Sequence, residues 1–172
     1  MIDFDAVDPS VLGLPLSVWR TLNSRVVLAL QRHHRPDVKL VGLVESEEVT
    51  IELRWTPVEL EREKLEDIKR VTEDGAEAIA LVLACNGTDW KVSRRLQSDL
   101  GEGADWLLVN VKTGDFLALE VSGTDDGDLV ALFNKKMEQA VSSMISPRSA
   151  STACVVRFQE PRVMKHTDHE PR

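Results

Sequence analysis

Apolar positions in the first third of the chain recur first at helical and then at strand spacing. From residue 17 to about residue 34 they lie three or four apart, as on one face of a helix, and Pro36 ends the pattern. Two alternating segments follow, over 38–44 and 49–55, around the polar turn ESEE. Thr56-Pro57 has the form of a helix start, a capping side chain followed by proline at the first helical position. This part of the chain therefore predicts the order α-β-β-α.

The pattern changes near residue 75, where a run begins that is apolar on nearly every side. Residues 76–85 (AEAIALVLAC) predict a helix buried against a sheet, and the following Asn-Gly pair predicts its end. Beyond it we expect three strands, a helix and a last strand, over residues 90–96, 105–111, 116–122, 128–144 and 152–158. The result is an α/β chain in which an N-terminal α-β-β-α extension precedes an αβββαβ core.

These elements suggest three parts of the chain. Residues 1–56 form a helix-hairpin extension and residues 57–160 form the core. The last part, 161–172, has the polar sequence PRVMKHTDHEPR, and we expect it to be a disordered tail.

Composition does not change the expected fold, but it argues against a membrane or nucleic acid as a binding partner. With 42% hydrophobic and 29% charged residues, the 172-residue chain resembles an ordinary soluble globular protein. Its apolar runs are shorter than the ~18 residues of a membrane span, and its acidic start is unlike a targeting segment, so we expect a cytoplasmic protein without a membrane partner. Cys85 and Cys154 lie in apolar runs and are expected to be buried, reduced thiols. A net charge of −8 opposes unaided binding to nucleic acid.

Asp105 and Glu120 are carboxylates in two otherwise apolar runs that flank the turn KTGD. If Thr113 and Gly114 are the two central residues of this turn, Asp105 lies opposite Ser122 and diagonal to Glu120 on the same face, with Cα atoms roughly 7–8 Å apart. That spacing suits two carboxylates that share a divalent cation. A shift of one residue would send Glu120 to the other face. A second interpretation stays open, in which each acid pairs with a structural Arg or Lys.

The expected order of elements over residues 72–158, together with these two acids, resembles the PD-(D/E)xK superfamily, the restriction-endonuclease-like fold. In that family an acid on the first core helix, an Asp on the second strand and an (Asp/Glu)-x-Lys motif on the third strand assemble a metal site. Its members typically cleave phosphodiester bonds with magnesium. The resemblance implies that Glu77 (or Glu73), Asp105 and Glu120 bind Mg²⁺ or Mn²⁺. Glu77 is the only charged residue of the apolar run 76–85.

The sequence departs from the family pattern at Ser122, which stands in EVSG where the family has its lysine. A serine cannot supply the positive charge that orients the attacking water and stabilises the transition state. Some family members bring a lysine from the following helix. At about 100° per residue, Lys136 falls within the apolar stripe centred on Phe133, whereas Lys135 points away. Lys136 would then replace the motif lysine, with Gln139 beside it to hold a water or phosphate oxygen; alternatively its stem packs over the core and its amine reaches solvent.

The resemblance implies a metal-dependent nuclease-like domain that hydrolyses phosphodiesters, with Asp105, Glu120, Lys136 and Gln139 as catalytic residues. The alternative is a catalytically inactive relative that keeps the fold and acts as a binding or assembly subunit, with a protein partner or a second copy of the chain. The acidic charge favours this alternative or a basic partner. The pair Arg94-Arg95, just before the acid site, either contacts phosphate or pairs with acidic residues.

Overall fold

The computed structural model describes residues 1–59, 67–96, 104–142 and 149–168. In chain order these residues form β1 (Ile2–Asp3), α1 (Pro9–Leu12), α2 (Leu16–Gln31), β2 (Val38–Val44), β3 (Glu47–Arg54), α3 (Ile68–Cys85), β4 (Trp90–Arg95), β5 (Trp106–Asn110), β6 (Phe116–Thr124), α4 (Leu129–Ser142), β7 (Ser149–Arg157) and β8 (Arg162–Asp168). The chain is thus a mixed α/β protein, as the sequence predicts.

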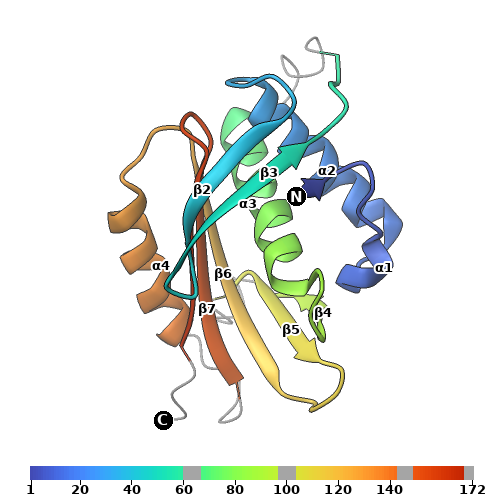
Figure 1. Cartoon of the computed structure of the whole chain (residues 1–172). Coiled ribbons are helices and arrows are strands. Elements are labelled where there is room, and N and C mark those ends of the chain that lie inside the picture. The colour runs from blue at the N-terminus through green and yellow to red at the C-terminus, as the bar shows by residue number, and fades with distance from the viewer. Residues whose placement is uncertain (60–66, 97–103, 143–148, 169–172) are drawn as a thin grey trace.

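The strands join in one mixed sheet with the order β1-β3-β2-β8-β7-β6-β5-β4. β4, β5 and β6 are antiparallel neighbours, whereas β6 and β7 are parallel, with α4 as the connection between them. Figure 1 shows α4 on one side of the sheet and α3 on the other, with α2 beyond α3. The hairpin of β2 and β3 belongs to the same sheet, because β2 pairs with β8.

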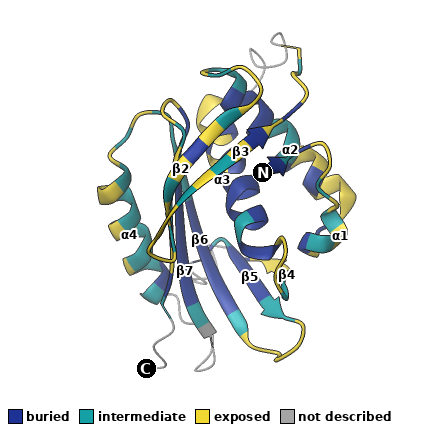
Figure 2. Ribbon diagram, viewed as in Figure 1, coloured by how far each residue is buried: buried dark blue, intermediate teal, exposed yellow. Residues whose placement is uncertain are grey.

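The main hydrophobic core lies on the α3 side of the sheet, and the alternation along β6 shows how the two faces differ. Leu117, Leu119 and Val121 belong to this core, together with side chains of α2 and α3. Ala118 belongs to a smaller cluster with Leu107 on the other face, towards α4. Figure 2 shows β6, β7 and much of α3 as buried, whereas the outer side of α4 is exposed. Even-numbered residues of β6 therefore face α4.

Helix α3 begins at Ile68, before the predicted start at residue 76, and ends at Cys85 as the sequence predicts. Its N-cap is Asp67, whose side chain accepts hydrogen bonds from the backbone N–H groups of Lys69 and Arg70. The predicted helix start at Thr56-Pro57 is wrong, because residues 55–59 are not helical. Hydrogen bonds that Asp5 accepts from the Thr56 N–H, and that Gln31 exchanges with the Val58 backbone, hold this segment in place. Residues 60–66 of that predicted helix lie outside the described residues, and its last residues, 68–71, form the beginning of α3.

The sequence pattern changes at Gly75 because α3 contacts α2 at this residue. A Cβ atom at Gly75 would lie 3.1 Å from the Cβ of Ala29 and 3.2 Å from the Cα of Val26, both on α2. A side chain at this position would therefore require α2 to shift by a few tenths of an ångström. The apolar run 76–85 is therefore the second half of one helix that packs against both α2 and the sheet.

The expected disorder of 161–172 is wrong for residues 162–168. These residues form β8, which lies between β2 and β7 and pairs with both. Val163, Lys165 and Thr167 are buried, so polar residues occupy two of the inward positions of this strand. Their partners come from the turn after β2, far away in the sequence, and a polar segment of this kind is easily mistaken for a tail. Residues 169–172 lie outside the described part of the chain.

Two further predictions can be compared with the structure. Cys85 and Cys154 are free and fully buried, which confirms the expectation of reduced thiols. Burial raises the pKa of each thiol to about 12. Among the described residues, none of the helices is both long and apolar enough to span a lipid bilayer.

Candidate acid site between β5, β6 and α4

The hairpin of β5 and β6 places Asp105 directly opposite Glu120. Trp106 pairs with Leu119, and the Asp105 N–H donates to the Leu119 carbonyl at 3.1 Å. The predicted register, in which Asp105 lies opposite Ser122, is wrong by two residues. Because a shift of two residues keeps the alternation of side chains, Glu120 still faces α4.

The connection between the two strands explains this shift. It runs over residues 111–115 instead of the expected two-residue turn. The Asn110 side chain accepts hydrogen bonds from the N–H groups of Lys112 and Thr113, and Gly114 adopts a φ of +75°. The loop is therefore longer than expected, and the first pair of residues after it is Val109 with Phe116.

Asp105 directly precedes β5, and its carboxylate binds a backbone N–H group of β6. Its Oδ2 accepts a hydrogen bond from the backbone N–H of Val121 at 2.7 Å. Burial raises the pKa of Asp105, although the Val121 N–H and the charges of Lys136 and Arg95 act to lower it. Asp105 therefore lies within electrostatic reach of basic residues from both α4 and β4.

Glu120 and Lys136 form an ion pair between the sheet and α4. The Lys136 Nζ lies 2.6 Å from the Glu120 Oε1, and the two side chains are 22% and 5% exposed. The Glu120 Oε2 is buried and has no hydrogen-bond partner among the described residues. Burial and the neighbouring Asp105 carboxylate raise the pKa of Glu120 to about 7, against the opposing effect of Lys136. Glu120 is thus a buried acid that lies next to Asp105 and is paired with the Lys136 ammonium.

Lys136 points towards the sheet, as the helical stripe predicts. Lys135 is exposed, whereas Lys136 and Gln139 are half-buried on the side of α4 that packs on β6 and β7. The Oε1 of Gln139 is itself buried. Ser122 follows Glu120 on the same face of β6 and adds no charge there.

Glu77 contacts a different set of residues, on the α3 side of the sheet. Its Oε1 accepts a hydrogen bond from Arg95 at 2.8 Å, and its Oε2 accepts one from the Trp106 indole N–H at 3.1 Å. Burial raises the pKa of Glu77 to about 7; the Arg95 charge opposes this, and Asp105 and Asp74 add to it. Glu77 is therefore near Asp105 electrostatically, but its two oxygens are held by Arg95 and Trp106.

Sequence reasoning missed the residues that surround Glu77. The Arg95 guanidinium lies over the Trp106 ring, 5.2 Å from its centre, and 3.9 Å from the Asp74 carboxylate. Arg25 and Arg70 also approach Asp74, at 3.6 and 3.7 Å. The Arg94-Arg95 pair was a visible signal, and the structure shows that Arg95 pairs with acids. Arg70 and Arg95 are more than half exposed, so this side of the site presents positive charge to solvent.

The donor set can be compared with the needs of a divalent cation. The described residues contain no group of three acids, histidines or cysteines arranged to hold a metal ion. Asp105 and Glu120 offer two adjacent carboxylates, and one buried Glu120 oxygen accepts no hydrogen bond from the described part of the chain. Mg²⁺ is commonly bound by one or two carboxylates together with waters and substrate phosphates. The pair fits that pattern as a two-carboxylate site, with Glu77 outside it.

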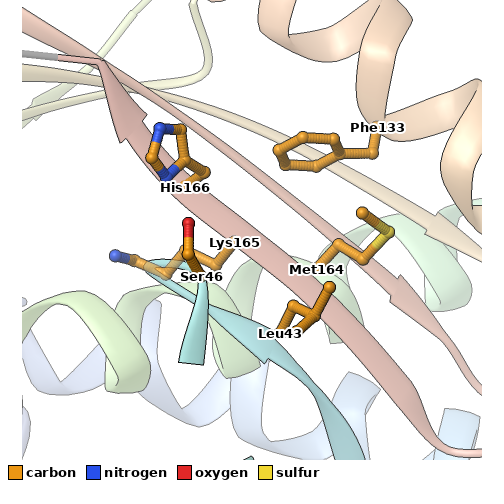
Figure 3. A pocket seen from close by; sticks show the side chains of 6 residues that line it. All are labelled: Leu43, Ser46, Phe133, Met164, Lys165 and His166. Carbon is orange, nitrogen blue, oxygen red and sulfur yellow. The ribbon is translucent and has the colours of Figure 1, made fainter. Parts of the chain in front are cut away.

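A small pocket on the same side of the sheet as α4 is separate from this site. It has a volume of about 160 Å³, and Figure 3 shows Phe133 of α4 across from Met164 and Leu43. Ser46, Lys165 and His166 complete its lining. Its lining includes neither Asp105 nor Glu120, so Phe133, the centre of the helical stripe, faces β8 and not the acids.

Comparisons of the chain with models of protein families, with curated proteins and with solved structures found no match. A functional interpretation therefore depends on the geometry of the site.

Proposed function

We propose that this chain is a divergent, nuclease-like domain of the PD-(D/E)xK superfamily that hydrolyses phosphodiesters with Mg²⁺ or Mn²⁺. The observation that carries the proposal is the contact of Lys136 with Glu120 beside Asp105. An ammonium from the helix that follows β6 thus reaches the acid pair, in a chain that has Ser122 where the family motif has a lysine. The order α3-β4-β5-β6-α4-β7, with helices on both faces, agrees with the core of that superfamily.

In this proposal Asp105 and Glu120 would hold the cation, which would supply Lewis-acid charge for phosphodiester hydrolysis. Both acids must be ionised to bind it, and a pKa of about 7 for Glu120 makes that binding favourable at neutral to alkaline pH. The Lys136 ammonium has three N–H groups, of which one binds Glu120, so it can also donate to a phosphate oxygen that gains charge. Gln139 is near enough along α4 to orient a water or a second phosphate oxygen.

A second candidate function is that of an inactive binding or assembly subunit with the same fold. The side chain of Glu120 is only 5% exposed and is already paired with Lys136. A purely structural ion pair has these properties, and the net charge of −8 opposes nucleic acid as a partner. In that case the chain acts with a basic protein partner or with a second copy of itself.

Cleavage assays distinguish the two candidates. The full chain is incubated with single- and double-stranded DNA and RNA in millimolar Mn²⁺ at about pH 8, above the pKa of about 7 of Glu120. We expect cleavage of at least one substrate, a loss on the order of 100-fold in Lys136→Met, and the wild-type rate in Lys135→Met, the exposed neighbour.

Two outcomes contradict the nuclease proposal. If the wild-type protein cleaves none of the four substrates, the inactive alternative is favoured. If Lys136→Met and Lys135→Met cleave equally well, Lys136 does not replace the missing lysine. Circular dichroism of both variants verifies that they are folded.

A further inference from the structure

A second and larger pocket lies on the α3 side of the sheet, away from the acid site. Its volume is about 490 Å³, within the size range of small-molecule sites. Its apolar wall is formed by the end of α3, by β4 and by β6, through Leu83, Ala84, Trp90 and Leu117. An aromatic ring and aliphatic side chains together suit an apolar body of modest size.

The polar part of the lining is an ion pair between the buried Lys165 of β8 and Glu45, which lies in the turn after β2 and is 40% exposed. The side chain of Lys165 is only 8% exposed, and its ammonium contacts the Glu45 Oε1. The Glu45 carboxylate also accepts hydrogen bonds of 2.8 Å from the backbone N–H and the hydroxyl of Thr167. Glu45 has a positive φ of 51°, an uncommon conformation for this residue type. The fold therefore holds Glu45 firmly against Lys165.

The two members of this pair differ in how completely their hydrogen bonds are satisfied. Glu45 receives one bond from Lys165 and two from Thr167. Lys165 has three N–H groups, and within the described part of the chain its ammonium bonds to Glu45 alone. A buried ammonium with N–H groups left over is stabilised by any oxygen acceptor that enters the pocket.

The charge of the pair restricts what that acceptor can be. Lys165 and Glu45 cancel each other, so an anionic ligand gains little net attraction and meets the Glu45 carboxylate. A cationic ligand meets the Lys165 ammonium. We propose that this pocket binds an uncharged small molecule with an apolar body and a carbonyl oxygen that accepts a hydrogen bond from Lys165. The body packs against Trp90 and Leu83, and the carbonyl points to β8.

Three probes with the same apolar body test this assignment. 4-Phenyl-2-butanone is neutral and carries a carbonyl, 4-phenylbutyrate is an anion, and 4-phenyl-2-butylamine is a cation. Each is titrated into the ¹⁵N-labelled full chain, and binding is located by amide chemical-shift changes. We expect the ketone to bind about tenfold more tightly than either charged probe, with shifts at Leu83, Ala84 and Lys165.

Variants separate the hydrogen bond from the cavity. Lys165→Met removes the ammonium and is expected to weaken ketone binding about tenfold. Lys135→Met makes the same change at an exposed residue of α4 outside the lining of the pocket, and is expected to leave ketone binding unchanged. Leu83→Trp fills the pocket from its half-buried wall and is expected to abolish binding, which keeps the test decisive if Lys165→Met fails to fold.

Several results would overturn the assignment. They are equal affinity for the three probes, no binding at millimolar ketone, shifts that map instead to Phe133 and Met164, or undiminished binding in Leu83→Trp. Shifts at Phe133 and Met164 would place the ligand in the smaller pocket of Figure 3.

Discussion

Replacing Lys136 by methionine tests the physical description of the acid site without any assumption about catalysis. The change keeps the length of the side chain and removes the ammonium 2.6 Å from the Glu120 Oε1. Glu120 then remains buried beside Asp105, and no other basic side chain of the described residues forms an ion pair with it. Removing one partner of a fully buried ion pair costs roughly 3–5 kcal/mol. Since Lys136 is 22% exposed and partly screened by water, we expect a loss of about 2 kcal/mol in the free energy of unfolding at about pH 8.5.

The same variant has a pH dependence whose sign follows from the pKa of Glu120. In the native protein burial and Asp105 raise this pKa from 4.5 to about 7. The native state therefore binds more protons than the unfolded chain between these two values, and stability falls as the pH rises through that window. At about pH 5.5 Glu120 is largely protonated in the native protein, and the charge of Lys136 matters less. The loss in Lys136→Met is expected to shrink below about 1 kcal/mol there.

Urea unfolding of wild type, Lys136→Met and Lys135→Met at the two pH values measures both effects. Lys135 is exposed on the same helix, so Lys135→Met is expected to change stability by less than about 0.5 kcal/mol. An equal loss at both pH values, or an equal loss in the two variants, would refute the description of Glu120 as a buried acid held by Lys136.

Three further predictions concern the fold around the site. Gly123→Ala places a Cβ 2.2 Å from the Thr72 carbonyl oxygen, so urea unfolding should show a loss of about 2 kcal/mol, and a neutral result would contradict the close contact of β6 with α3. A chain that ends at residue 161 lacks β8, which joins β2 to β7; its thermal melt should lose cooperativity, whereas a wild-type melt would show that 162–168 is dispensable. Cys85 and Cys154 are buried and have pKa values of about 12, so an aromatic disulfide reagent should label neither thiol in the native protein and both in urea; rapid native labelling would contradict their burial.

The order of helices and strands was the most predictable part of the fold, because local periodicity determines it. The apolar run before Cys85 and the stripe around Phe133 each identified a helix, and the stripe also gave the inward direction of Lys136. Strand β8 was missed, because two of its buried positions are the polar Lys165 and Thr167. Their burial depends on Glu45, and no local pattern contains that partner.

The acid site was also only partly predictable, because some of its features are local in the sequence and others depend on tertiary contacts. Asp105 and Glu120 were recognised because charges are rare within apolar strands. The register differs from the predicted one by two residues, so the two acids still lie on the same face of the sheet. The exact pairing depended on Asn110 and its turn hydrogen bonds, which the sequence does not reveal. The contacts of Glu77 with Arg95 and Trp106 depend on how α3 lies across β4 and β5, and this is a property of the tertiary structure.

Binding of Mn²⁺ tests the central claim, a metal site formed by Asp105 and Glu120, most directly. Electron paramagnetic resonance measures the free ion during titration of the full chain at about pH 8, above the pKa of about 7 of Glu120. We predict saturable binding to wild type that is lost in Asp105→Asn and in Glu120→Gln, and retained in Glu77→Gln because Glu77 bonds to Arg95 and Trp106 instead. Absence of saturable binding to wild type, or the same affinity in Asp105→Asn, would contradict the claim.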